Sequence, residues 1–141
     1  MSDNKAEVQK KVMELQMLQH QAREVQRQAQ MLEQQAGEME LVQQAIDDFS
    51  RAKAGSESFV TLTPGVFVKA RIENTESVLL NVGGGAVVEK AVPDAKELIA
   101  RQTQELRKMQ DEMVVQLQKI MQRAEKSQEE LRALVKQKES K

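Results

Sequence analysis

Apolar side chains recur every three or four residues through the first third of the chain, which is the spacing of a coiled-coil helix. Counted in sevens, the seam positions are Val8, Leu15, Ala22, Ala29, Ala36 and Gln43 in one series and Lys11, Leu18, Val25, Leu32, Met39 and Ile46 in the other. Only Lys11 and Gln43 interrupt the stripe, so we predict one long helix over residues 5–53. Gly37 lies off the seam; we interpret it as a tolerated glycine, and a hinge is the alternative.

A second helical pattern occupies residues 94–138, and Pro93 and Asp94 mark its start. Its apolar positions are Ile99, Leu106, Met109, Met113, Leu117, Ile120, Ala124, Leu131 and Leu134. The two successive steps of four that begin at Met109 resemble a stutter, which locally unwinds a left-handed supercoil. We therefore predict a second long helix with an irregular seam.

Residues 57–92 change to the alternating pattern of β-strands. Thr63-Pro64-Gly65 divides the first half into two strands, and Gly83-Gly84-Gly85 divides the second half. The glycine run raises the alternative of a phosphate-binding loop. It leads into the strand sequence Ala86-Val87-Val88, however, and it lacks the Lys-Ser/Thr pair that opens a helix in a P-loop. The pattern therefore favours two β-hairpins.

Four strands return the chain to the side that it left, so we expect the two helices to pair antiparallel. The predicted fold is a single α+β domain over residues 1–141, with a long two-helix coiled coil and two central hairpins. Both faces of the hairpins carry apolar groups, and neither face has an obvious cover within the chain. We infer an obligate oligomer in which strands of several chains complete a sheet or β-barrel. The side chains expected to make this assembly are Val66, Phe67, Val68, Ile72, Val78, Leu80, Val82 and Val88.

Composition agrees with extended helices rather than one compact core. The 141 residues include no Trp or Tyr and only three Phe, and 30% of them are charged. The net charge of −1 gives no general attraction to nucleic acid or to an anionic membrane. The N-terminus lacks an apolar signal core, and no stretch approaches the ~20 apolar residues that span a bilayer. We expect a soluble cytoplasmic protein without nucleic-acid or membrane partners.

Side chains suited to catalysis or metal binding are scarce. The chain has no cysteine, and its one histidine, His20, has only Gln16 and Glu24 as neighbours at helical spacing. The many carboxylates lie on helix surfaces without a pocket that would shift their pKa values. We therefore expect no catalytic site, no metal, no cofactor and no enzymatic activity.

Antiparallel pairing would bring the two chain ends together, remote from the hairpins. Val12, Met13 and Met17 lie outside the seam there, so they would be partly exposed. One interpretation is a second packing face for a neighbouring helix, or a frayed end. The other is a tip that binds varied apolar surfaces, a task for which methionine is well suited.

Two motifs between the helices resemble the prefoldin family, specifically its alpha class. The motifs are Thr63-Pro64-Gly65-Val66-Phe67-Val68-Lys69-Ala70 and Asn81-Val82-Gly83-Gly84-Gly85-Ala86-Val87-Val88-Glu89-Lys90. The first is similar to the family's proline-glycine hairpin, and the second to its glycine turn with a Val-Val-Glu-Lys strand. Two hairpins rather than one distinguish the alpha class from the beta class.

The resemblance implies an ATP-independent chaperone that holds unfolded proteins at coiled-coil tips and delivers them to a group II chaperonin. It also implies a hexamer of two alpha and four beta subunits, joined through β-barrels and of archaeal type. Matched to the tip, the expected client-binding residues are Val8, Val12, Met13, Leu131, Leu134 and Val135. The alternative function is a structural coiled-coil adaptor whose apolar tips bind one specific folded partner.

Overall fold

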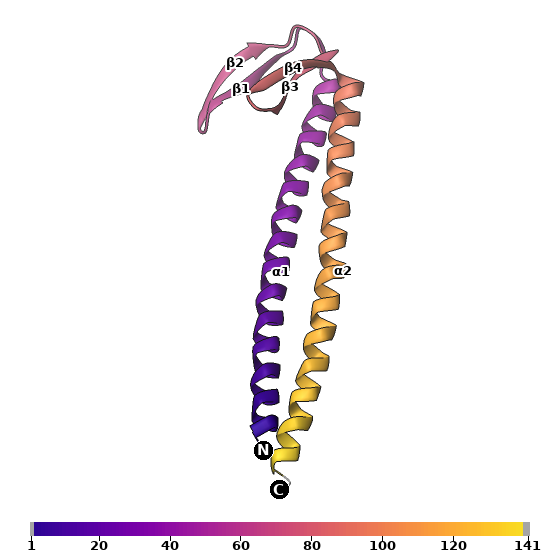
Figure 1. Cartoon of the computed structure of the whole chain (residues 1–141). Coiled ribbons are helices and arrows are strands. Elements are labelled where there is room, and N and C mark those ends of the chain that lie inside the picture. Colours follow the sequence, from indigo (N-terminus) through magenta and orange to yellow (C-terminus); the bar gives the residue numbers. More distant parts are fainter. Residues whose placement is uncertain (1, 140–141) are drawn as a thin grey trace. The chain divides into compact units, whose positions relative to one another are not determined.

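Two long helices flank four strands in the computed structural model, which describes residues 2–139 (Figure 1). In chain order the elements are α1 (Ser2–Arg51), β1 (Glu57–Thr63), β2 (Val66–Arg71), β3 (Ser77–Gly83), β4 (Ala86–Ala91) and α2 (Val92–Glu139). The strands form two separate antiparallel pairs, β1 with β2 and β3 with β4. The predicted combination of two coiled-coil helices with two hairpins is confirmed.

The helix ends differ from the predicted residues by a few positions. α1 begins at Ser2 rather than residue 5 and ends at Arg51 rather than residue 53. α2 begins at Val92, directly after β4 and two residues before the predicted start. Pro93 is accommodated because an N–H in the first turn of a helix has no helical acceptor. The Val92 N–H donates to the carbonyl of Glu76 at 2.9 Å. The first residue of α2 is therefore still hydrogen-bonded to the residue that precedes β3.

The described chain forms two compact units. One contains α1 up to Gln35 together with α2 from Leu106 onward. The other, Ala36–Glu105, contains the remaining helix segments and both hairpins. In each unit the segments of α1 and α2 lie side by side and run antiparallel (Figure 1).

The predicted heptad pattern of α1 is confirmed. Every predicted seam position from Val8 to Ile46 is buried or half-buried. Ala36 is completely buried, because a methyl side chain lets the partner helix approach closely. Lys11, which interrupts the apolar stripe, is also half-buried and forms an ion pair with Glu130 of α2. The charged interruption is thus satisfied across the seam.

The predicted seam of α2 is wrong at Met109, which is 47% exposed. Gln110 lies half-buried in the seam instead, and its Nε2 donates to Oε2 of Glu33 on α1 at 2.5 Å. The cross-helix hydrogen bond offsets the cost of placing an amide there. Buried and half-buried positions therefore advance by alternating steps of three and four from Thr103 to Leu134, and the predicted stutter does not occur in this described stretch.

The two hairpins are built alike, because each strand of the second begins 20 residues after its counterpart in the first. Each longer strand contains one unpaired residue, Leu62 in β1 and Val82 in β3. Pro64-Gly65 and Gly84-Gly85 form the two-residue turns. Gly84 and Gly85 have φ values of 61° and 78°, as a type I′ turn requires. The glycine run is thus the predicted hairpin turn and not a phosphate loop.

The core of the second unit joins both helices to the second hairpin. Its buried cluster is Ile46, Val92, Ala95 and Ile99, with Met39, Phe49, Val78 and Leu80 packed against it. Alternate residues of β3 therefore face the helices, whereas Leu79 between them is 71% exposed. The expectation that neither face of the hairpins has a cover is wrong for this face of β3.

Candidate functional site

The first candidate surface lies where the start of α1 pairs with the end of α2 (Figure 1). Leu18 of α1 and Ser127 of α2 are buried in the seam there. The ion pair between Lys11 and Glu130 crosses the seam closer to the chain ends. The predicted pairing of residues near the two chain ends is therefore present in the first unit.

Exposed apolar side chains lie outside the seam on both helices at this end. Val12 is 37% exposed, Met13 69%, Met17 63% and Val135 40%. We call these four residues the terminal patch. Val8, Leu131 and Leu134, which were also predicted to bind clients, are half-buried in the seam. A two-helix coiled coil buries only one stripe of each helix, so the terminal patch is left to solvent.

Sequence reasoning missed other exposed apolar side chains on the helices. They are Met31, Leu41 and Val42 on α1 and Val114, Val115 and Met121 on α2. The signal was present, because these residues fall between the seam positions of the heptad pattern. Leu41 and Val42 are 72% and 37% exposed, close to the exposed fractions of Met13 and Val12. They therefore provide an internal comparison for the terminal patch.

Charged side chains flank the terminal patch and align the two helices. The hydrogen bond from Lys11 lowers the pKa of the Glu130 carboxyl below its usual value of 4.5. The same bond raises the pKa of Lys11. Lys11 also lies 3.4 Å from Glu14 on its own helix. The pair joins the helices close to the patch and leaves the patch itself apolar.

Further polar contacts join α1 to α2 at Glu33 and at Asp47. Hydrogen bonds from Gln110 and then Arg107, the latter at 2.6 Å, hold the pKa of Glu33 below its usual value. In the second unit Lys96 Nζ lies 2.7 Å from Oδ1 of Asp47 and lowers the pKa of that carboxyl. Exposed pairs of this kind add little stability each, but they favour one axial register of the helices.

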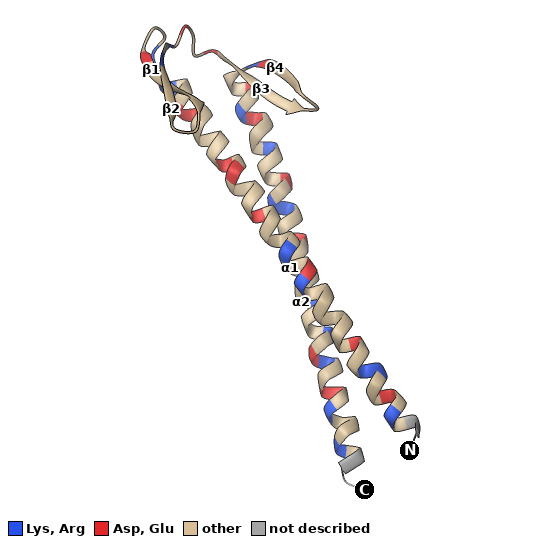
Figure 2. Ribbon diagram, turned by 90° about the vertical axis from the view of Figure 1, so that its left-hand side faces the viewer, with Lys and Arg blue, Asp and Glu red and all other residues tan. Residues whose placement is uncertain are grey.

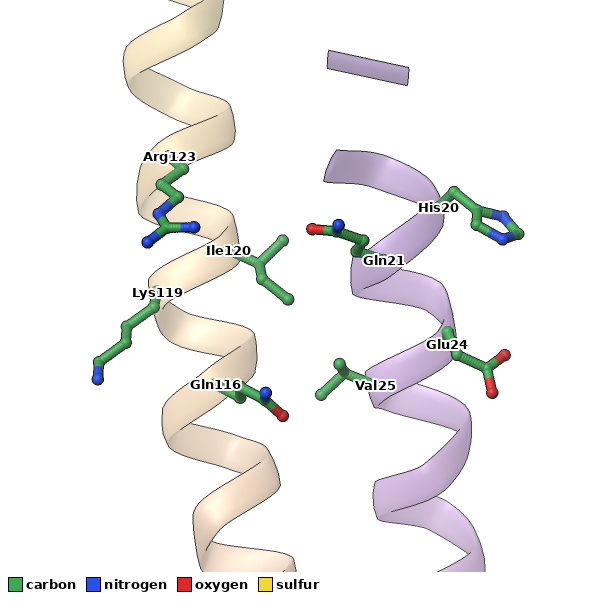
Figure 3. Close-up of a pocket in the computed structure, with 8 residues that line it drawn as sticks. All are labelled: His20, Gln21, Glu24, Val25, Gln116, Lys119, Ile120 and Arg123. Atoms are coloured by element: carbon green, nitrogen blue, oxygen red, sulfur yellow. The ribbon is translucent and has the colours of Figure 1, made fainter. Parts of the chain in front are cut away.

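Figure 3 shows a groove of the first unit between α1 and α2. Val25 and Ile120 point into it from opposite helices, as seam residues do, while His20 and Glu24 point away on α1. Lys119 points away on α2. Among the described residues no group of three His, Asp or Glu side chains could hold a metal ion. The amides of Gln21 and Gln116 also point into the groove from the two helices, so it combines apolar packing with two neutral polar groups.

Lysine and arginine are interspersed with aspartate and glutamate along both helices (Figure 2). A nucleic-acid backbone is bound by a stripe of positive charge, and this mixed pattern does not provide one. Within residues 2–139, no helix has an apolar run long enough to cross a membrane.

The second candidate surface is formed by the hairpins. Five of the predicted assembly residues are exposed: Val66, Phe67, Val68, Val82 and Val88. Ile72, Val78 and Leu80 are half-buried, and the last two pack against the chain's own helix cluster. The sequence reasoning did not select Phe59 and Leu79 for assembly, although each is 71% exposed. The part of all these residues in assembly remains a prediction.

The fold defines an antiparallel coiled-coil protein that carries paired hairpins, and comparisons with known proteins narrow this class. The family model described as "Prefoldin subunit" matches residues 18–137. The chain is 32% identical to prefoldin subunit alpha of Archaeoglobus fulgidus over 127 residues, which cover 90% of this chain and 93% of that protein. It is 30% identical to prefoldin subunit alpha of Methanobrevibacter smithii over 76% of this chain and 73% of that protein.

A solved structure shares the fold. It is a cryo-EM structure of filamentous PFD from Methanocaldococcus jannaschii, with a TM-score of 0.57 and 13% sequence identity. The match covers 89% of this chain and 98% of that one. The chain therefore belongs to the prefoldin family, as its hairpin motifs predicted. Membership of this family supports a chaperone role and partners that are other prefoldin subunits.

Proposed function

We propose that this chain is one subunit of an ATP-independent holdase that binds unfolded proteins and transfers them to a group II chaperonin. Clients bind at the terminal patch and at the neighbouring seam residues Val8, Leu131 and Leu134. The observation that carries this proposal is the exposure of Val12, Met13 and Met17 beside a seam that is otherwise packed. Family membership supports the chaperone class of function.

Reversible apolar contact is the chemistry of this proposal. Burial of apolar surface contributes about 25 cal/mol per Å², so a few side chains give only weak binding. Several subunits that hold one client add their contacts, which raises the overall affinity without any new kind of contact. Methionine is flexible and polarizable, so it adapts to clients of different sequence. Binding and release at equilibrium need no nucleotide.

Assembly with other subunits is the second part of the proposal. The hairpins present exposed apolar side chains, among them Phe67 and Val68, and have unpaired strand edges. Such edges are stabilised when further strands pair with them. We propose that they join β-barrels in a hexamer of two alpha-type and four beta subunits. The likeness to prefoldin alpha subunits supports this arrangement.

The central test compares two matched double variants, Val12→Ser/Met13→Ser and Leu41→Ser/Val42→Ser. Each removes an adjacent pair of apolar side chains with nearly equal exposure from the same helix. Each variant is assembled with its partner subunit, and light scattering follows the aggregation of a diluted, denatured test protein without ATP. A bound client would bury part of the Val12 and Met13 side chains. The first variant loses these two contacts, so its affinity for the client should be about tenfold weaker. The second variant should protect as the parent does.

Equal protection by both variants would remove the terminal patch from client binding. Native mass measurement of each complex shows whether it remains assembled. The adaptor alternative is tested with several unrelated unfolded proteins and a set of native ones. Protection of several unfolded proteins supports a holdase, and binding to a single native protein supports an adaptor. Transfer is tested by adding a group II chaperonin to the client-loaded complex and following the client on native gels.

A further inference from the structure

The methionines of this chain differ widely in exposure. Of eight in the sequence, the exposed ones in the described structure are Met13, Met17, Met31, Met109 and Met121. Met13 and Met17 have the largest exposed fractions, 69% and 63%. They are four residues apart, so they lie on adjoining turns of one face of α1. Two thioethers thus provide most of the exposed apolar surface of the terminal patch.

The surroundings of Met13 and Met17 leave both residues exposed. The same helix face carries the exposed residues Gln16 and His20, which do not bury the thioethers. Met31 differs, since its Sδ accepts a hydrogen bond from Nη1 of Arg27 at 3.3 Å. Met39 and Met113 differ as well, because they are half-buried in the seam. Exposure controls how readily a methionine is oxidised.

We propose that Met13 and Met17 form an oxidation site that switches the terminal patch from apolar to polar. This inference rests on the proposed holdase function. A sulfur lone pair attacks one oxygen of hydrogen peroxide, an S–O bond forms, and the O–O bond breaks. The departing hydroxide takes the proton from the oxygen that is now bound to sulfur and leaves as water. The thioether is oxidised to a sulfoxide and the peroxide is reduced, so one oxygen atom is transferred for each residue.

The sulfoxide changes the surface without disturbing the helix pair. Both side chains lie outside the seam, which Leu15 and Leu18 occupy at this level of α1. The helices therefore keep their packing when the two sulfur atoms become polar. A polar sulfoxide makes a poor contact for an apolar client segment, so the client is bound more weakly. Methionine sulfoxide reductases reverse the reaction, which makes the site a switch.

The test treats the assembled complex with hydrogen peroxide and uses two variants, Met13→Leu/Met17→Leu and Met31→Leu/Met109→Leu. Leucine has nearly the same volume as methionine and cannot form a sulfoxide. The second variant is a control for oxidation elsewhere, since both of its methionines are 47% exposed and lie outside the terminal patch. Peptide mass spectrometry measures the oxidation of each methionine, circular dichroism measures helicity, and light scattering measures protection of a denatured test protein.

We expect peroxide to oxidise Met13 and Met17 before Met39 and Met113, with helicity unchanged. Client affinity should fall about tenfold in the parent and in Met31→Leu/Met109→Leu. Met13→Leu/Met17→Leu should show no fall in affinity when peroxide-treated and untreated complexes of the same variant are compared, and a methionine sulfoxide reductase should restore the affinity of the parent. A peroxide-dependent loss of protection in Met13→Leu/Met17→Leu as large as that of the parent, or full protection by an oxidised parent, would overturn the inference. Protection before peroxide is added tests the holdase function by itself.

Discussion

Replacement of Ser127 by alanine is expected to stabilise the pairing of α1 and α2. Ser127 is 2% exposed, and its Oγ has no hydrogen-bond partner among the described residues. It lies in the seam of α2, one turn before Glu130, which pairs with Lys11. The hydroxyl has thus left water without gaining a bond in the folded protein. Alanine removes the unsatisfied oxygen and retains the Cβ that fills the seam.

Three contributions set the expected change in the free energy of unfolding. An unsatisfied buried polar group costs about 1–3 kcal/mol. The higher helix propensity of alanine adds up to about 0.5 kcal/mol. The small cavity left by one oxygen atom opposes these terms by about 0.3 kcal/mol, at ~24 cal/mol per Å³. The net expectation is a stabilisation of about 1–3 kcal/mol.

Urea unfolding followed by circular dichroism measures this change at a fixed protein concentration. Thr103→Val is the matched control, because Thr103 is also a buried hydroxyl residue in the seam of α2. Its Oγ1 donates to the carbonyl of Ile99 at 2.9 Å, so this hydroxyl is satisfied. Valine should leave stability unchanged or lower it by up to about 1 kcal/mol. The two variants should therefore shift the urea midpoint differently.

A Ser127→Ala protein that is no more stable than its parent would refute this reasoning. That result would mean that the Ser127 hydroxyl keeps a hydrogen bond to water in the folded state. The adjacent groove, which is lined by Lys11, Glu14 and Arg123 among others, is where such a water would lie.

Three other predictions concern charge, packing and turn geometry. In the folded protein the pKa of Asp47 lies below its usual value of 3.8, and that of Glu130 lies below 4.5. The two carboxylates therefore stabilise the fold above their usual pKa values, and this contribution is lost as the pH falls through the lower pKa values of the folded state. The melting temperature should therefore fall as the pH drops below about 4.5, and it should fall less in Glu130→Gln. An equal fall in this variant would contradict the role of the pair between Lys11 and Glu130. Ile46→Ala should cost about 2–5 kcal/mol in urea unfolding because Ile46 is buried in the helix cluster, whereas the exposed Leu41→Ala should cost less than about 0.5 kcal/mol. Gly84→Val places a β-branched residue at a φ of 61° and should cost about 1–2 kcal/mol, and a thermal melt like that of the parent would argue against this turn.

The heptad pattern predicted the packing of α1 well because its seam is mostly apolar from Val8 to Ile46. The same reasoning failed in α2 where it preferred the apolar Met109 to the polar Gln110. A polar seam residue is explained only by its partner on the other helix, here Glu33, and a single helix pattern does not contain that information. The burial of Ser127 was missed for a similar reason, because a small hydroxyl side chain is typical of a surface position.

The hairpins were predictable because their turns need particular residues. Gly84 and Gly85 adopt positive φ values that most residues avoid, so the glycine run marked the corner. The cover over one face of β3 was not predictable, because it depends on how Val78 and Leu80 meet the ends of both helices. For the terminal patch, heptad position indicated that Met13 lies outside the seam. The heptad pattern of one chain does not identify what binds there, because that depends on contacts with a second molecule.

Site-specific photo-crosslinking tests the central claim most directly. A benzophenone amino acid is placed at Met13 in one protein and at Leu41 in another, positions with similar exposed fractions on the same helix. Each assembled complex is irradiated with a denatured, labelled test protein, and crosslinked client is quantified on gels. The proposed function predicts strong crosslinks from position 13 and few from position 41. Crosslinks of equal yield at both positions, or mainly at position 41, would contradict client binding at the terminal patch.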